Sequence, residues 1–417
     1  MYKRWIQFGS AVIAMVMIAN LQYAWTLFVP ALRSAHKDWA LNGVQLAFTL
    51  FIFFETWITP VEGWMIDRLG PRIFLTMGGV LCGLGWTGMG YAQTLTQLWI
   101  WYAIAGVGAA FVYSGSVATA LKWFPDMRGR ASGFITAGFG AGSMLFIPLI
   151  ADILKTSGYK QAFLYTGIGQ GLVILVAAQV LQNPGPDFKV SPAAKKPVSP
   201  KLRRNTAQFT SVQMMMTPQF WLMYVAFVLT SVGGLMITAQ AAPVARGMAI
   251  PAAAIVMALA WSRGANGAGR IFWGWLSDYL GREMAMVIPF ALQAGCLVAV
   301  LTLGKLSGTW FIVTMIAIYF TWGSMFSLFP AIIGDYFGAD HATSNYGFLY
   351  TAKGVASIGG GWIAAKLFEK FGNWNADFYG TAALTLLSAF MILALKAMPL
   401  PKKAELEGEM VLAKTGS

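Results

Sequence analysis

Three basic residues lie inside stretches of the sequence that are otherwise apolar: Arg263, Arg270 and Lys353. A charged side chain at the centre of a membrane helix costs about 2.5–3.5 kcal/mol on insertion scales, and it usually faces a water-filled path or an anionic partner. Few acidic residues share these apolar stretches, so protein carboxylates are too few to neutralise all three cations. The pattern therefore predicts a site at which a small anion binds and leaves.

Arg270 and Lys353 offer complementary chemistry for such an anion. The guanidinium of Arg270 is a planar fork that takes a carboxylate with two hydrogen bonds, and the ammonium of Lys353 is a compact point charge. Together they fit a small carboxylate, especially one with two carboxyl groups. The alternative is that each cation pairs with a carboxylate on a neighbouring helix.

Arg263 precedes Arg270 on the same predicted helix, and the two side chains share a face about two turns apart. We expect Arg263 nearer the outer mouth, as a gating residue that steers anions inward or widens the range of ligands. The alternative is a salt bridge with Glu55, which we interpret as the only carboxylate well inside an apolar run. Glu55 is also a candidate coupling residue that carries a proton.

Four aromatic residues stand where a polar pocket needs walls: Tyr23, Tyr113, Trp322 and Tyr350. Ordinary packing is the alternative for each of them. Most other tryptophans and phenylalanines are expected to face lipid or to form belts at the two membrane interfaces.

The composition indicates a membrane protein. The chain has 417 residues, of which 57% are hydrophobic and 11% charged, whereas soluble proteins carry about 25% charged residues. Cys82 and Cys296 lie in apolar runs, and His36 and His341 lie near segment ends, so we expect no disulfide, no metal site and no cofactor. No nucleophile constellation or soluble catalytic domain is visible, which disfavours an enzyme.

The apolar stretches predict an all-α integral membrane fold. Twelve of them are long enough to cross about 30 Å of hydrocarbon as helices. They cover 6–30, 42–66, 72–93, 96–120, 131–154, 162–182, 217–241, 252–276, 283–303, 308–332, 345–368 and 377–397. We expect two pseudo-symmetric six-helix halves, 1–182 and 213–397, joined by a solvated cytoplasmic linker over 183–212 and followed by a loose cytoplasmic tail over 398–417.

The two halves share a motif, G-W-x-x-D-x-x-G, displaced by 211 residues. Its glycines and aspartates are Gly63, Asp67 and Gly70 after the second segment, and Gly274, Asp278 and Gly281 after the eighth. We expect a tight loop in which glycine permits the turn and aspartate caps the next helix or pairs with an arginine such as Arg72 or Arg130. Duplicated six-helix units with a site near the bilayer midplane are typical of secondary transporters.

The basic residues predict the orientation. Eighteen of the 29 fall on the side of the termini and the central linker, eight fall on the other side, and the remaining three are the buried cations. A basic excess marks the cytoplasmic side, so we expect a multi-pass inner (plasma) membrane protein with both termini in the cytoplasm. Topology thus accounts for the net charge of +13 without nucleic acid. The expected partners are small carboxylate anions and the lipid bilayer, and we expect a monomer.

Six stretches carry a resemblance to a known family. They are Leu21–Leu27, Val44–Leu50, Lys122–Gly129, Gly269–Gly274, Phe320–Gly323 and Asn345–Lys353. Through them the chain resembles, over nearly its whole length, the oxalate:formate antiporter family of the major facilitator superfamily. The resemblance implies that Arg270 and Lys353 bind the oxalate dianion, and that the cavity is lined by Gln22, Tyr23, Gln45, Tyr113 and Trp322.

The chain departs from that family's oxalate transporter at several cavity positions. Phe139 and Phe326 stand where the family's transporter has tyrosines, and Tyr350 stands where it has a tryptophan. Glu55 replaces a glutamine and Arg263 replaces a neutral residue. The resemblance therefore implies a less polar, slightly larger cavity, whose substrate differs in identity rather than in class.

We predict a secondary active transporter of small carboxylates, which exchanges oxalate for formate by alternating access. The alternative is proton-coupled symport of a monocarboxylate such as lactate, with Glu55 as the proton carrier. Related monocarboxylate transporters have an aspartate four residues before the matched arginine, and Asn266 at that position disfavours symport. A membrane sensor would bind the anion without moving it.

Overall fold

The computed structural model describes residues 2–124, 128–185, 188, 202–338 and 340–403, and these residues are almost entirely helical. The first half of the chain contains α1 (Tyr2–Tyr23), α2 (Trp25–Ala35), α3 (Leu41–Trp57), α4 (Thr59–Met89), α5 (Leu95–Trp123), α6 (Arg128–Thr156) and α7 (Tyr159–Val180). The second half contains α8 (Ser211–Met215), α9 (Pro218–Gly247), α10 (Ala252–Leu280), α11 (Arg282–Thr302), η1 (Gly304–Leu306), α12 (Gly308–Trp322), α13 (Met325–Phe337), α14 (Ala342–Ser357), the π-helical turn η2 (Ile358–Ile363), α15 (Ala364–Phe371) and α16 (Asn375–Ala397).

The helical segments confirm the predicted all-α membrane fold. Each of the twelve predicted spans coincides with one long helix, with part of α4, or with two or three helices placed end to end. Within the described residues, nine segments are long and apolar enough to cross a membrane. The predicted spans over 72–93, 252–276 and 345–368 fall short of that measure, and the last two contain the three buried cations.

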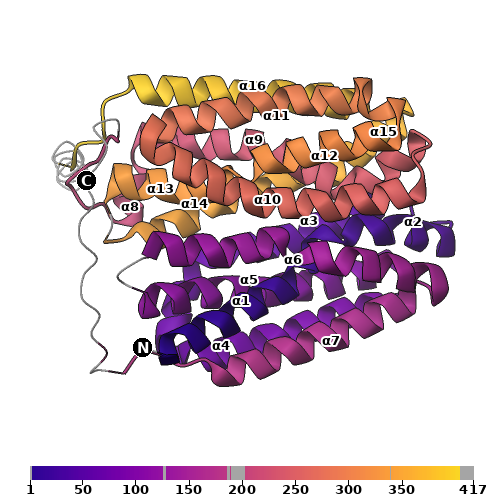
Figure 1. The fold of residues 1–417 in the computed structure, drawn as a ribbon, viewed down its shortest axis with the longest axis horizontal. Coiled ribbons are helices and arrows are strands. Elements are labelled where there is room, and N and C mark those ends of the chain that lie inside the picture. Colours follow the sequence, from indigo (N-terminus) through magenta and orange to yellow (C-terminus); the bar gives the residue numbers. More distant parts are fainter. Residues whose placement is uncertain (1, 125–127, 186–187, 189–201, 339, 404–417) are drawn as a thin grey trace, which may run out of the picture.

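The helices run side by side in two layers that follow the order of the chain (Figure 1). Helices α1–α7 form one layer, and α8–α16 form the other. The layers meet where α6 packs on α10, α3 packs on α14, and α2 packs on α9. The start of α1 and the end of α16 lie at the same end of the bundle, which we call the terminal end. The division at 182 and 213 stays a prediction.

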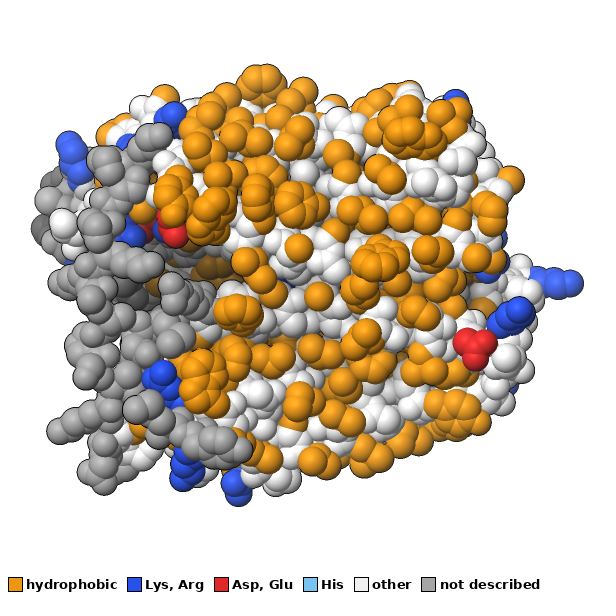
Figure 2. All heavy atoms as spheres, in the orientation of Figure 1, with side chains coloured by type: hydrophobic (Ala, Val, Ile, Leu, Met, Phe, Trp, Pro, Cys, Tyr) orange, Lys and Arg blue, Asp and Glu red, His pale blue; other side chains and the backbone are white. Residues whose placement is uncertain are grey.

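The surface in Figure 2 has the distribution of side chains that a bilayer requires. Hydrophobic side chains cover the middle of this face, and lysines and arginines gather toward its two ends. Most of the buried side chains are also hydrophobic, so packing between these helices depends on shape rather than on a contrast between polar and apolar faces.

Part of the predicted linker is bound to the second half rather than solvated. Its residues 186–187 and 189–201 lie outside the described residues, as does the tail from 404. Arg203 donates hydrogen bonds to the carbonyl oxygens of Lys396 (2.9 Å) and Met398 (2.7 Å). Arg204 pairs with Asp335 at 3.0 Å. These contacts tie the end of the linker to α13 and to the end of α16.

The repeated motif forms the expected turns. Its last glycines, Gly70 and Gly281, have φ values of 75° and 87° with extended ψ, a conformation that is essentially restricted to glycine. In the second copy, Asp278 pairs at 2.8 Å with Arg282, an arginine that the prediction did not name. The side chains of Asp67 and Arg130 lie outside the described residues, and the pairing in the first copy stays a prediction.

Close packing between α10 and α12 requires glycine at one position. A Cβ atom added to Gly269 would collide with the backbone carbonyl oxygen of Phe320, which has no means to move away without shifting α12. A Cβ atom added to Gly274 on the same helix would meet only Ser327 at an ordinary 3.4 Å.

We therefore expect Gly269→Ala to lower thermal stability strongly and Gly274→Ala to change it little. The physical reason is overpacking, which costs about 1–3 kcal/mol or more when the backbone has to shift. The measurement is the midpoint of thermal unfolding of the two variants in the same detergent. Equal midpoints would show that α10 and α12 are packed differently from this structure.

Candidate functional site

Four interrupted helices meet around the buried cations. The first predicted span breaks between Tyr23 and Trp25, and the second breaks at Ile58. The tenth breaks between Trp322 and Met325, and the eleventh turns into the π-helical turn η2 after Ser357. Breaks of this kind free backbone groups inside a membrane, and they are tolerated where the chain lines a site. They mark the region that holds Gln22, Glu55, Phe326 and Lys353.

Lys353 has a protein partner. Its ammonium donates hydrogen bonds to Glu55 Oε2 (2.8 Å), Gln22 Oε1 (2.9 Å) and the hydroxyl of Tyr350 (3.2 Å). The side chains of Lys353 and Glu55 are 0% and 1% exposed. For Lys353 the structure therefore has the alternative arrangement, a pair with a carboxylate on a neighbouring helix, while too few carboxylates remain to neutralise all three cations. The alternative for Arg263, a Glu55–Arg263 bridge, is wrong, because α3 packs against α14 and presents Glu55 to Lys353.

Arg270 is buried without an acidic partner among the described residues. Its Nη1 donates to the carbonyl oxygen of Thr136 (2.7 Å), its Nε donates to Asn266 Oδ1 (3.1 Å), and its Nη2 contacts the hydroxyl of Tyr23 (3.5 Å). All three acceptors are neutral, so they fix the direction of the guanidinium and leave its charge uncompensated. The contact with Thr136 also joins α10 to α6 of the other layer.

Arg263 is fully buried and lies between two aromatic rings. Its guanidinium carbon is 3.9 Å from the ring centroid of Tyr319 and 4.6 Å from that of Tyr23. None of its three guanidinium nitrogens has a hydrogen-bond partner in the described part of the chain. Cation–π contacts contribute roughly 0.5–2 kcal/mol, which is small against the cost of burying an unpaired charge. Arg263 therefore does not lie at an open outer mouth in this conformation.

Two phenylalanines lie close to both Arg270 and Lys353. The guanidinium carbon of Arg270 is 4.3 Å from the ring of Phe326 and 5.8 Å from that of Phe139. The ammonium of Lys353 is 5.9 Å and 5.8 Å from the same two rings. The structure thus brings together the two cations that the sequence predicts as substrate ligands, and both of them lie against the same two apolar rings.

The remaining predicted wall residues fall into two groups. Tyr113 stacks on Tyr350 and meets Phe139 edge-on, and Trp322 packs against Phe326, so these residues do surround the cations. Gln45 does not. Its amide binds the carbonyl oxygen of Ala239 (2.9 Å) and Gln240 (3.0 Å) on α9, and its oxygen accepts a hydrogen bond from Trp25 (3.0 Å). These bonds join the two layers at the end of the bundle opposite the terminal end.

Two buried residues near the site were missed by the sequence analysis. Tyr319 supplies the nearest ring to Arg263. The signal in the sequence was its polar hydroxyl, at a position between Phe311 and Trp322 in an otherwise apolar helix. Glu62 is also buried and accepts a hydrogen bond from Ser114. Glu55 is therefore not the only carboxylate inside an apolar run, because the predicted second span includes Glu62.

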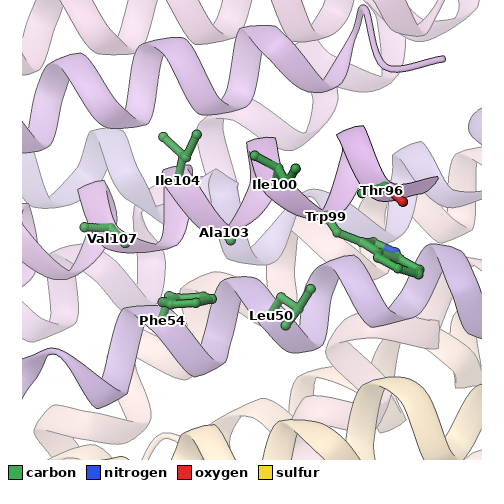
Figure 3. A pocket seen from close by; sticks show the side chains of 8 residues that line it. All are labelled: Leu50, Phe54, Thr96, Trp99, Ile100, Ala103, Ile104 and Val107. Carbon is green, nitrogen blue, oxygen red and sulfur yellow. The ribbon is translucent and has the colours of Figure 1, made fainter. Parts of the chain in front are cut away.

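A hollow on the surface lies away from these residues. Figure 3 shows it between α3 and α5, where Leu50 and Phe54 face Trp99, Ile100 and other side chains of α5. Its lining is apolar except for Thr96. A lining without charged groups suits lipid chains, so the buried cations rather than this hollow form the candidate site.

A known protein family matches most of this chain. The model of the Major Facilitator Superfamily matches residues 11–361 and 264–414. The chain belongs to the Major Facilitator Superfamily. The oxalate:formate antiporter of Oxalobacter formigenes is 36% identical over 409 residues, which cover 98% of this chain and 94% of that protein. This similarity confirms the resemblance that the sequence motifs indicate.

Two other relatives are more distant. The apicoplast pyruvate carrier 1 of Toxoplasma gondii is 24% identical and covers 82% of this chain and 73% of its own. Monocarboxylate transporter 13 of Rattus norvegicus is 22% identical and covers 94% and 88%. The superfamily and these relatives identify the chain as a membrane transporter, in which a site between two layers of helices is the expected arrangement.

Proposed function

We propose that the protein exchanges small carboxylates across the membrane, in the manner that the name of its oxalate:formate antiporter relative describes. The observation that carries the proposal is the uncompensated guanidinium of Arg270, which neutral acceptors hold between the two layers. A planar carboxylate presents two oxygens to such a fork. Lys353 and Tyr350 supply a second polar wall beside Phe139 and Phe326.

The charge of the site explains why exchange is favoured over net flow. Arg263, Arg270 and Lys353 are positive, and Glu55 neutralises one of them, which leaves an excess of two positive charges among these four residues. Closing helices around uncompensated charges is costly, because it removes them from water. A bound carboxylate reduces that cost, so the layers change conformation readily when loaded and slowly when empty.

Alternating access requires contacts between the layers that open and close. On the side opposite the terminal end, Gln45 bonds to Gln240, and the hydroxyl of Thr26 accepts a hydrogen bond from the backbone of Ala242 at 2.8 Å. These bonds close that side in the present conformation and would break when it opens. We assign that side to the exterior, and we place both termini in the cytoplasm of an inner-membrane protein, because the basic residues favour the terminal end.

Counterflow in proteoliposomes tests the proposal. Vesicles loaded with formate should take up labelled oxalate rapidly, and vesicles without internal anion should not. Because oxalate carries two charges and formate carries one, the exchange moves net charge, and an imposed membrane potential of 100 mV should bias it by about 2.3 kcal/mol per charge.

The control is the same measurement with protein-free vesicles and with a proton gradient in place of internal formate. Uptake that follows the proton gradient and ignores internal anion would identify a symporter. Absence of carboxylate flux under every gradient would remove the proposed function.

A further inference from the structure

Several buried side chains carry hydrogen-bond donors that the described residues leave without acceptors, and three of these side chains belong to or adjoin the candidate site. Their donors are the Nε, Nη1 and Nη2 atoms of Arg263 on α10, the Nε1 atom of Trp322 on α12, and the Nε2 atom of Gln22 on α1. All three side chains are fully buried. Buried polar groups almost always have partners, so a set of donors without them indicates a ligand that supplies acceptors.

The side chains of Arg263 and Trp322 pack on the same tyrosine. The guanidinium of Arg263 lies against the rings of Tyr319 and Tyr23. The ring of Tyr319 meets that of Trp322 edge-on at 5.6 Å, and Gln22 precedes Tyr23 in the chain. The donors of Arg263 and Trp322 therefore belong to side chains that pack on Tyr319, whereas Gln22 adjoins the same region on the side of Lys353.

Arg270 reaches the same tyrosine as Arg263. The guanidinium of Arg263 lies over the ring of Tyr23, and Nη2 of Arg270 is 3.5 Å from its hydroxyl oxygen. Tyr23 thus lies between two guanidiniums on one face of α10. Glu55 binds Lys353 through Oε2, and within the described residues no hydrogen bond or ion pair joins it to either arginine.

We propose that Arg263 and Arg270 together bind a dicarboxylate that is longer than oxalate, with one carboxylate on each guanidinium. This inference rests on the proposed function and specifies the substrate class of the same site. The Cα atoms of the two arginines are separated by about 10.5 Å along the helix, and their side chains converge on one tyrosine. The carboxyl carbons of oxalate are bonded to each other, so one or two intervening methylene groups give a better match to two separate guanidiniums.

Neutralisation of Lys353 by Glu55 supports the same conclusion. A cation that already has a buried carboxylate gains less from a substrate than a cation that has none. The two free positive charges of the site therefore belong to Arg263 and Arg270. The substrate that matches them is a dianion with its two charges held apart, of which malonate and succinate are suitable probes.

A competition experiment with Arg263→Gln tests the inference. Labelled formate exchange is measured against unlabelled oxalate, malonate and succinate in wild-type and variant proteoliposomes. The ratio of half-inhibitory concentrations for succinate and oxalate is independent of the amount of active protein. We expect the variant to raise this ratio, and the ratio for malonate and oxalate, by at least about tenfold, the scale of one lost charge-assisted interaction. Arg246→Gln removes an exposed arginine and should leave both ratios unchanged.

If Arg263→Gln does not transport, a binding measurement tests the role of Arg263. Malonate or succinate should raise the melting temperature of the wild-type protein in detergent more than acetate does, and Arg263→Gln should lose that excess. Equal shifts in both proteins, or equal changes in all three inhibitors, would overturn the role of Arg263 while oxalate–formate exchange stands. Failure of the wild-type protein to exchange any carboxylate would instead remove the proposed function.

Discussion

Arg270→Gln is expected to abolish carboxylate exchange. Glutamine keeps a polar side chain that can reach Asn266, but it removes the charge and the fork that receive the substrate carboxylate. Truncating one partner of a buried, hydrogen-bonded charge pair costs about 2–5 kcal/mol, which corresponds to about 30-fold or more in rate. The measurement is the initial rate of oxalate–formate counterflow, normalised to the amount of protein in the vesicles.

Two further variants make this prediction sharper. Arg270→Lys keeps the charge but does not bind Thr136 and Asn266 at once, so we expect a partial loss that lies between wild type and Arg270→Gln. Arg246→Gln is the matched control, because Arg246 is an exposed arginine at the end of α9. Full counterflow in Arg270→Gln would show that the substrate does not contact this residue.

Breaking the Glu55–Lys353 pair is expected to cause the largest loss of stability. Glu55→Gln leaves a buried ammonium without a carboxylate, and Lys353→Gln leaves a buried carboxylate without a cation. Removing one member of a buried ion pair costs about 3–5 kcal/mol, because the other charge remains buried and unpaired. Each single variant should therefore unfold at a clearly lower temperature in detergent than the wild-type protein.

The double variant Glu55→Gln/Lys353→Gln distinguishes the loss of the ion pair from the cost of leaving one buried charge unpaired. It contains no unpaired charge at this position, so its melting temperature should recover most of the loss, and the two substitutions should be strongly non-additive. Asp152→Asn, at an exposed carboxylate on α6, should have little effect. Additive losses in the double variant would mean that Glu55 and Lys353 are not partners in solution.

The sequence predicted the membrane-spanning segments because hydropathy is a local property. A long apolar stretch has to form a helix in a bilayer, since its backbone polar groups have no other partners there. The repeated motif was equally local, and Gly70 and Gly281 adopt the positive φ that the turn predicts. Arg263, Arg270 and Lys353 could be recognised for the same reason, because a charge in an apolar stretch stands out without knowledge of its neighbours.

The partners of those charges could not be predicted in the same way. Glu55 and Lys353 are 298 positions apart in the chain, and their contact depends on how α3 is rotated against α14. Helical periodicity gives the face and the depth of a side chain, but it does not give the rotation of one membrane helix relative to another, which packing decides. That is why Gln45 joins α9 instead of lining the site.

The sequence by itself determined that this chain crosses the membrane many times and carries three cations in its apolar spans, because both follow from the transfer of residues between water and lipid. The tertiary structure alone decided which cation is neutralised and which two are not. It placed Tyr23 between Arg263 and Arg270, and it interrupted the helices beside Gln22 and Lys353. These arrangements arise from contacts between distant segments, and such contacts leave no periodic pattern in the amino-acid sequence.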